Sequence, residues 1–199
     1  MLVLVTGPPA AGKTTLARPL AGALGLPLIG KDLIKEALFD ALGVGDRAWS
    51  RRLGVASYEV LYAVAGELSA AVVDANLGPE AGPRLCAVHA DLVEVFCRCP
   101  ADEVERRFAA RASARHPGHV DHLTGPEMKE ALARGIEPLR LGGPVLEVDT
   151  SQPVDTAEVA RWVRASVPEG GLALTRVGLT TTPGRPHPQP RVSGPRTGG

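Results

Sequence analysis

The chain has 199 residues, of which 44% are hydrophobic and 22% are charged, a composition typical of one globular domain rather than a disordered or fibrous chain. Lys plus Arg and Asp plus Glu both number 22, so the formal net charge is zero. The sequence lacks the basic surplus of a protein that binds nucleic acid through bulk charge. It also lacks the apolar run of about 20 residues that spans a bilayer. Three cysteines and no basic leader before the first apolar run favour a cytoplasmic protein in a reducing compartment.

Short apolar runs alternate with amphipathic segments over residues 1–167, which is the pattern of βαβ units around a parallel sheet. In chain order the pattern predicts a strand at 2–5, a helix at 13–24, a strand at 27–29, a helix at 32–42 with Asp32 as its N-cap, a long helix at 50–68, strands at 70–74 and 91–97, a helix from Pro100, a short helix at 126–134, a strand at 144–148 and a helix at 155–167. We therefore expect an α/β fold of three layers with a central parallel sheet of about five strands.

The last part of the chain has a different composition. Residues 168–199 contain six prolines, seven glycines and a single acidic residue, and no apolar periodicity continues beyond Thr175. Such a segment cannot bury enough apolar surface to offset its conformational entropy. We expect residues 1–167 to form the folded domain and residues 168–199 to be a disordered tail.

A glycine-rich motif stands between the first strand and the first helix. It fits the pattern G-x-x-x-x-G-K-[ST] and consists of Gly7, Pro8, Pro9, Ala10, Ala11, Gly12, Lys13, Thr14 and Thr15. Glycines let the backbone wrap closely around phosphates, and the N–H groups at the helix N-terminus supply partial positive charge. The motif predicts a P-loop, in which Lys13 contacts the β- and γ-phosphates and the Thr14 hydroxyl is a ligand of Mg²⁺.

Asp32 follows the second strand, at the sheet edge where open α/β folds bind ligands. A carboxylate there can accept the proton of an acceptor hydroxyl, and Lys35, one helical turn later, can reach the same cleft. The alternative is that Asp32 only caps the helix and that Lys35 is a solvated helix residue.

A second group of candidates lies on the helix after the fourth strand. Arg107, Arg111 and Arg115 recur every four residues, so one helix face carries three guanidinium groups that can stabilise a transferring phosphoryl group. A solvated helix face is the alternative. The segment after it carries His116, His119, Asp121 and His122, which resembles a metal site only superficially because Pro117-Gly118 indicates a turn. These residues are expected in the substrate pocket or in the turn that ends the helix.

Further residues outside these motifs are candidates for the site. Asp74 ends an apolar strand, as a Walker B carboxylate does, and would hold Mg²⁺ or line the acceptor pocket; a strand-end cap is the alternative. Arg52 and Tyr58 lie on the long predicted helix, which would form a wall on the acceptor side or pack as ordinary core. Asn76, Glu80 and Arg84 are expected in a loop near the acceptor.

Over about residues 1–167 the sequence resembles the small P-loop kinases of the zeta-toxin and chloramphenicol-phosphotransferase type. The resemblance rests on the P-loop, on Asp32 with a basic residue three positions later, and on the arginine-rich segment with Arg107, Arg111 and Arg115, which corresponds to the lid of these kinases. That family usually has Arg where this chain has Lys35. The resemblance implies that Asp32 activates the acceptor hydroxyl and that Thr150, Ser151, Gln152 and Pro153 lie beside the nucleotide base.

The implied activity is Mg²⁺-dependent transfer of phosphate from ATP or GTP to a hydroxyl of a small molecule, such as an antibiotic (as a resistance mechanism), a nucleoside or a sugar. The alternatives are a regulatory NTPase that hydrolyses its nucleotide and a toxin-like kinase of a nucleotide sugar. The expected partners are the nucleotide and the hydroxylated acceptor, with neither a nucleic acid polymer nor a membrane. The sequence indicates no particular oligomeric state.

Overall fold

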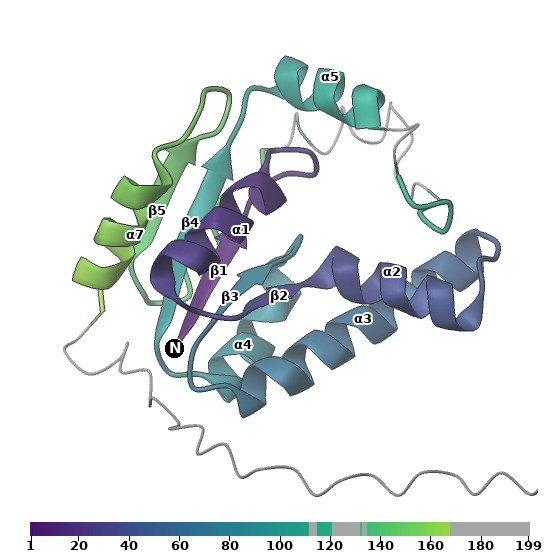
Figure 1. Ribbon diagram of the computed structural model, residues 1–199, viewed down its shortest axis with the longest axis horizontal. Coiled ribbons are helices and arrows are strands. Elements are labelled where there is room, and N and C mark those ends of the chain that lie inside the picture. Colours follow the sequence, from purple (N-terminus) through teal and green to yellow (C-terminus); the bar gives the residue numbers. More distant parts are fainter. Residues whose placement is uncertain (112–114, 121–131, 133–134, 168–199) are drawn as a thin grey trace, which may run out of the picture.

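The computed structural model describes residues 1–111, 115–120, 132 and 135–167. Its centre is a sheet of five parallel strands in the order β2-β3-β1-β4-β5 (Figure 1). The strands are β1 (Leu2–Thr6), β2 (Leu28–Gly30), β3 (Ala71–Asp74), β4 (Leu92–Arg98) and β5 (Val145–Asp149). The prediction of a three-layer α/β fold with a five-stranded parallel sheet is confirmed.

Helices cover both faces of the sheet. The helices of the described residues are α1 (Lys13–Leu24), α2 (Lys31–Leu42), α3 (Arg47–Glu67), the 3₁₀ turn η1 (Pro79–Ala81), α4 (Gly82–Val88), α5 (Ala101–Arg111) and α7 (Thr156–Ala165). In Figure 1, α1 and α7 lie on one face, α3 and α4 on the other, and α2 and α3 run side by side away from the sheet. None of the helices in the described part of the chain is long and apolar enough to span a membrane.

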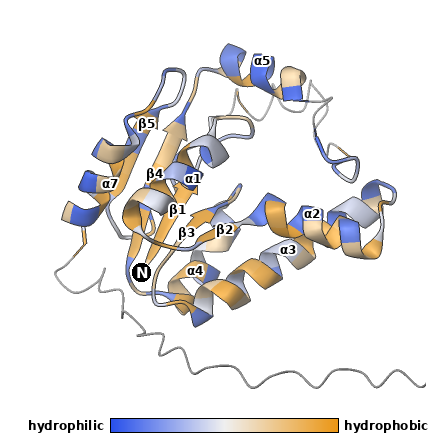
Figure 2. Cartoon of the chain, viewed as in Figure 1, coloured by the Kyte–Doolittle hydropathy of each residue, from blue (hydrophilic) through white to orange (hydrophobic). Residues whose placement is uncertain are grey.

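Alternation along β1 divides the core into two clusters. Val3 and Val5 belong to the cluster beneath α1 and α7, whereas Leu2 and Leu4 belong to the cluster beneath α3 and α4. Figure 2 shows the strands as almost continuously hydrophobic. Strands of a parallel sheet have helices on both faces, so both sets of side chains are buried and the sequence shows an unbroken apolar run.

One charged residue lies inside this apolar sheet. Glu94 on β4 is only 4% exposed. Its carboxylate accepts hydrogen bonds from the Thr6 hydroxyl at 2.6 Å and from the backbone N–H groups of Leu139 and Arg140, both at 3.0 Å. These three hydrogen bonds satisfy the buried carboxylate and join the connection before β5 to the sheet.

Several element boundaries differ from the sequence-based prediction. Helix α2 begins at Lys31 with Gly30 as its N-cap, so Asp32 lies in the first turn and is not the cap. Helix α3 begins earlier than expected, because the Asp46 side chain accepts a hydrogen bond from the N–H of Trp49 and caps it. The predicted helix at 126–134 lies mostly outside the described residues, and the predicted tail at 168–199 lies wholly outside them.

The expected loop at 76–84 is partly helical, because η1 and α4 begin within it. Arg84 lies on α4, where its guanidinium donates two hydrogen bonds to the Glu59 carboxylate on α3. Arg84 and Glu80 do not line the large cleft described below, whereas Asn76 does.

Candidate active site

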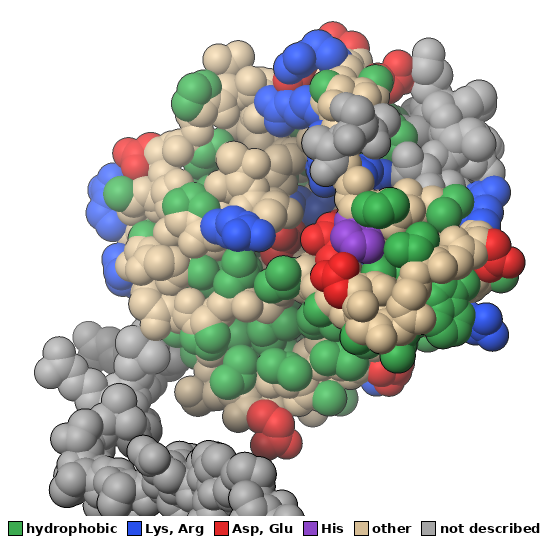
Figure 3. All heavy atoms as spheres, turned by 45° about the vertical axis from the view of Figure 1, so that its right-hand side comes forward, with side chains coloured by type: hydrophobic (Ala, Val, Ile, Leu, Met, Phe, Trp, Pro, Cys, Tyr) green, Lys and Arg blue, Asp and Glu red, His purple; other side chains and the backbone are tan. Residues whose placement is uncertain are grey.

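A cleft of about 970 Å³ opens at the carboxyl edge of the sheet. It is lined by the P-loop, the first turns of α1 and α2, the end of β3, the cleft-facing side of α5, residues 115 and 119, and the loop after β5. Figure 3 shows a hollow with Lys and Arg side chains inside it and with Asp, Glu and His side chains at its rim. The carboxyl edge is where parallel α/β sheets bind ligands.

The P-loop has the backbone conformation that phosphate binding requires. Gly7 has φ +131°, and a Cβ there would lie 2.5 Å from the carbonyl oxygen of Cys97 on β4, so only glycine fits. Gly12 has φ +88° and is the N-cap of α1, without a side-chain hydrogen bond to the helix. The first N–H groups of α1 therefore keep their capacity to bind an anion in the cleft.

Lys13 is a buried cation within this loop. It is only 8% exposed, and its Nζ donates to the carbonyl oxygens of Gly7 at 3.0 Å and Pro8 at 2.6 Å. Burial lowers the pKa of Lys13 to about 8, although the nearby carboxylate of Asp74 acts in the opposite direction. Phosphate oxygens would supply the negative charge that this buried ammonium group requires.

Thr14 and Asp74 form the second polar pair of the cleft. The Thr14 hydroxyl donates to Oδ2 of Asp74 at 2.6 Å. Burial raises the pKa of Asp74, more than the hydrogen bond from Thr14 and the charge of Lys13 lower it. Hydroxyl and carboxylate oxygens are ligands that Mg²⁺ prefers, and Mg²⁺ needs only one or two carboxylates besides phosphates and water. The pair therefore fits Mg²⁺, while the described residues contain no group of three or more His, Cys, Asp or Glu for another metal.

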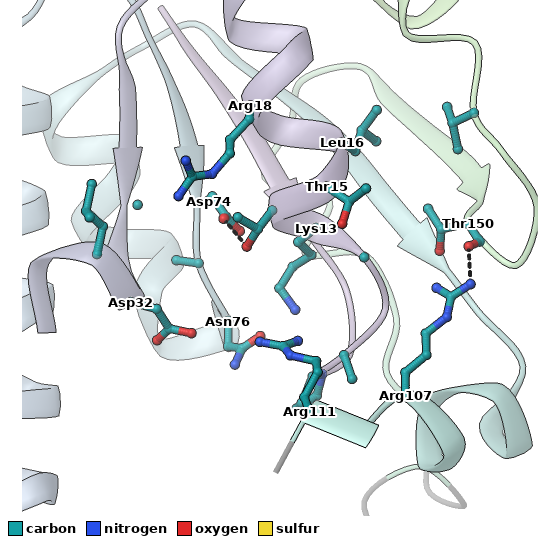
Figure 4. A pocket seen from close by; sticks show the side chains of 18 of the residues that line it. Lys13, Thr15, Leu16, Arg18, Asp32, Asp74, Asn76, Arg107, Arg111 and Thr150 are labelled. Carbon is teal, nitrogen blue, oxygen red and sulfur yellow. Dashed lines mark hydrogen bonds between the residues drawn. The ribbon is translucent and has the colours of Figure 1, made fainter. Parts of the chain in front are cut away.

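Asp32 approaches the same space from α2. Its carboxylate accepts a hydrogen bond from Nζ of Lys31 at 3.0 Å and is 47% exposed. Burial raises the pKa of Asp32, but Lys31, His119 and Arg115 together outweigh it, so the pKa lies below its usual value. In Figure 4 the side chains of Lys13, Asp32 and Arg111 converge on one space. An ionised carboxylate is thus held opposite a phosphate-binding loop.

The arginines of α5 complete the opposite wall. Arg107 donates through Nε to Glu103 at 2.6 Å and through Nη2 to the carbonyl oxygen of Thr150 at 2.9 Å (Figure 4). Arg111 and Arg115 also line the cleft, as do Thr150 and Ser151. Arg107 and Arg111 line the cleft from α5, whereas Arg115 lines it from the segment beyond the end of that helix, so the described helix carries two of the three expected arginines. Arg107 also links α5 to the loop expected beside the nucleotide base.

Of the predicted P-loop residues, Gly7, Pro8 and Ala11 do not line the cleft, and neither do three predicted site residues on α2 and α3. Lys35 is 2% exposed, donates to the Ser50 hydroxyl at 3.0 Å and lies 5.3 Å from the centre of the Phe39 ring, because this face of α2 packs on α3. Tyr58 donates its hydroxyl to the carbonyl oxygen of Asn76 behind the cleft. The Arg52 guanidinium stacks on the Trp49 ring, 4.9 Å from its centre, on the exposed side of α3.

Long helix α3 therefore forms no wall of the cleft, and its inward side chains are core residues. The cysteines of β4 and the loop after it follow the packing interpretation: Cys97 is buried in the core, and Cys99 is partly buried against it.

Sequence reasoning missed several residues of the cleft. They include Arg18 on α1, Leu33 and Glu36 on α2, and Val154 after β5. Gln152 and Pro153, which also line the cleft, were expected beside the nucleotide base, and His119 was considered as a residue of the substrate pocket or of a turn. For Glu36 a signal existed, because it stands four residues after Asp32 and so on the same helix face.

The strand–P-loop–helix unit, the parallel sheet and the paired Thr14 and Asp74 define a P-loop fold of the nucleoside-triphosphate-binding class. A family model described as "AAA domain" matches residues 2–134, which is more than half of the chain, so the protein belongs to this AAA domain family. No curated protein matches the chain.

Solved structures agree with this assignment. A crystal structure of a candidate kinase from Chloroflexus aurantiacus J-10-fl is 36% identical, with a TM-score of 0.78 over 84% of this chain and 98% of that one. The fold is also similar to shikimate kinase from Acinetobacter baumannii in complex with shikimate (19% identity, TM-score 0.54, 82% and 90% of the two chains). A gluconokinase from Sinorhizobium meliloti 1021 is similar as well (20% identity, TM-score 0.51, 86% and 90%). At these identities the last two show the fold alone.

Proposed function

We propose that the protein is a kinase that transfers the terminal phosphoryl group of ATP, or of GTP, to a hydroxyl of a small molecule. The observation that carries the proposal is the placement of Asp32 across one cleft from Lys13 and the lid arginine Arg111. A kinase needs a group facing its P-loop from the acceptor side that takes the proton of the acceptor hydroxyl, and Asp32 would be that group.

The P-loop side binds the nucleotide. The N–H groups at the start of α1 and the Lys13 ammonium bind the β- and γ-phosphates, and Arg107 and Arg111 stabilise the charge that spreads over the transferring oxygens. Thr14 and Asp74 would hold Mg²⁺, which when bound neutralises phosphate charge. Thr150 and Ser151 lie where the base or ribose of the nucleotide would be placed.

Asp32 acts on the acceptor. Its low pKa keeps it ionised at neutral pH, so it accepts a hydrogen bond from the acceptor hydroxyl and takes the proton as the transfer proceeds. The new bond forms between the hydroxyl oxygen and the γ-phosphorus, and the bond from that phosphorus to the β-phosphate oxygen breaks. The products are a phosphate ester and the nucleoside diphosphate.

Antibiotics, nucleosides and sugars are the acceptor classes that we propose, with drug inactivation as one biological role and the cytoplasm, which supplies ATP and Mg²⁺, as the place of action. Support comes from the 36% identical chain described as a candidate kinase and from a fold shared with kinases of gluconate and shikimate. The resemblance to zeta-toxin-type kinases keeps a nucleotide sugar among the acceptors.

The test measures ATP turnover by the wild-type protein alone and with chloramphenicol, uridine, N-acetylglucosamine and UDP-N-acetylglucosamine, with mass spectrometry of the products. We expect turnover to depend on one acceptor and to yield its phosphate ester. Asp32→Asn should lower transfer by about 10² or more while ATP affinity stays close to that of the wild type. The control is Asp40→Asn, which changes an exposed carboxylate on the same helix. ATP hydrolysis that no acceptor stimulates, and that Asp32→Asn leaves intact, would contradict the proposal in favour of a regulatory NTPase.

A further inference from the structure

His119, which the proposed mechanism does not use, lines the part of the cleft next to α2. Residues 115–120 pack against α2, and two histidines of this segment face α2 carboxylates: His116 lies 3.1 Å from Asp40 and His119 lies 3.0 Å from Glu36. Both rings also contact the Phe39 ring. Only His119 lines the cleft.

The hydrogen bond to Glu36 fixes how the His119 ring carries its proton. The partner of its Nε2 is Oε1 of Glu36, and an ionised carboxylate only accepts hydrogen bonds, so Nε2 carries the hydrogen. In the neutral ring Nδ1 is then an acceptor, and among the described residues it has no hydrogen-bond partner. Burial lowers the pKa of His119 and favours this neutral ring, with Lys35 acting in the same direction and Asp32 and Glu36 in the opposite one.

The backbone before His119 is held by a hydrogen bond from α3. Buried Ser50 on α3 donates its hydroxyl to the Gly118 carbonyl oxygen at 3.0 Å and receives a hydrogen bond from Lys35 at 3.0 Å. Gly118 also packs so closely on Phe39 that any side chain there would overlap the ring. Lys35 therefore supports the cleft indirectly, by fixing the segment that carries His119.

The anchoring places His119 beside the proposed base. Asp32 and Glu36 are four residues apart on α2 and both line the cleft, so they are neighbours on one helix face with Cβ atoms roughly 5–6 Å apart. The ring bonded to Glu36 thus lies about one helical turn from the carboxylate that would take the acceptor's proton. The exposed Leu33 of the same helix also lines the cleft.

We propose that His119 is an acceptor-binding residue, whose Nδ1 accepts a hydrogen bond from a second hydroxyl or amine of the acceptor, and that Glu36 is its positioning residue. The inference rests on the proposed kinase function. It narrows the acceptor to a polyol or amino alcohol whose second donor stands about one helical turn, roughly 5 Å, from the hydroxyl that is phosphorylated. A monohydric alcohol would leave the buried Nδ1 without a partner.

The test compares variants that keep one ring nitrogen's function and remove the other's. His119→Gln keeps a donor for Glu36 near the place of Nε2 and removes the acceptor, whereas His119→Asn puts an amide oxygen near the place of Nδ1. With the best acceptor among chloramphenicol, uridine and N-acetylglucosamine, all of which carry several hydroxyls, we expect His119→Gln to lower kcat/KM for the acceptor about tenfold or more, with His119→Asn retaining part of the activity. The KM for ATP should change less than twofold.

His116→Asn is the matched control. His116 lies in the same segment as His119 but does not line the cleft. Its Nδ1 accepts a hydrogen bond from the N–H of Gly118, and the Asn amide oxygen can accept this bond instead. The kinetics with the phosphate acceptor should therefore be unchanged. Nitrogen-15 NMR of the His119 ring gives a readout independent of turnover: Nε2 should carry the hydrogen in the wild type and in Glu36→Gln, and the preference should weaken in Glu36→Ala.

The outcomes separate the two proposals. If the wild type phosphorylates an acceptor and His119→Gln does so with the same kcat/KM, the inference is overturned and the kinase function stands. Equal losses in His116→Asn and His119→Gln would also overturn it, because the segment would then act only as a structural support. If the wild type phosphorylates none of the panel, the proposed function fails and the inference fails with it.

Discussion

Replacing Lys13 by methionine should stabilise the nucleotide-free protein while removing nucleotide binding. Lys13 is 8% exposed, and within the described part of the chain its ammonium group donates hydrogen bonds to two carbonyl oxygens of the P-loop. When no phosphate is bound, the folded protein keeps the charge of Lys13 away from water, which lowers its stability. The residue that phosphate binding requires therefore destabilises the nucleotide-free protein. Methionine has a similar length and no charge.

The pKa gives the magnitude. Burial lowers the pKa of Lys13 from 10.5 to about 8, and each pKa unit corresponds to 1.36 kcal/mol, so holding the proton below pH 8 costs the folded state about 3 kcal/mol. Above pH 8 only the unfolded chain keeps this proton, and stability therefore rises towards pH 10. Methionine also loses two hydrogen bonds worth about 1 kcal/mol each, which leaves a net gain of roughly 1 kcal/mol at pH 7.

Denaturant unfolding of both proteins at about pH 7 and about pH 10, with and without MgATP, measures these effects. Without nucleotide, the free energy of unfolding of Lys13→Met should exceed that of the wild type at pH 7, and the gain should disappear at pH 10. MgATP should stabilise the wild type alone. Arg51→Met, which removes an exposed charge on α3, controls for the loss of a cation. A less stable Lys13→Met at pH 7, or a wild type whose stability does not rise above pH 8, would refute the reasoning.

Three further changes test other parts of the structure. Thr14→Ala removes the hydroxyl that donates to Asp74. In a magnesium titration it should raise the Mg²⁺ concentration needed for half-maximal activity at least several-fold, while nucleotide binding in EDTA stays unchanged. A titration midpoint equal to that of the wild type would count against this Mg²⁺ site. Glu94→Ala leaves a buried hydroxyl and two partly buried N–H groups without their acceptor and should lower the free energy of unfolding by about 2 kcal/mol or more, measured in urea; a loss below about 1 kcal/mol would mean that water replaces the carboxylate. Gly118→Ala should displace its segment from Phe39 and raise the KM for the acceptor but not for ATP, whereas equal rises would place the effect elsewhere.

The sequence by itself determined the parts of the protein whose physics is local. The P-loop is a short motif, and glycines at positions 7 and 12 are required by the backbone angles that the structure shows there. The strands could be recognised because a sheet covered on both faces leaves an unbroken apolar run in each strand. The placement of Asp32 and Asp74 followed from topology, since the ends of parallel strands meet at one edge.

Only the tertiary structure decided which side chains of α2 face the cleft. Lys35 and Glu36 are adjacent in the sequence, yet Lys35 is buried against α3 and Glu36 lines the cleft with Asp32. Both faces of α2 carry polar residues, and the hydrophobic pattern alone did not indicate which face would meet the next helix. Phe39 of α2 stacks on His116 and Ser50 of α3 donates a hydrogen bond to Gly118, so a segment 68 residues after Ser50 contributes to the orientation of α2. Long-range packing therefore buries Lys35, which was expected in the catalytic site, and places His119 in the lining of the cleft.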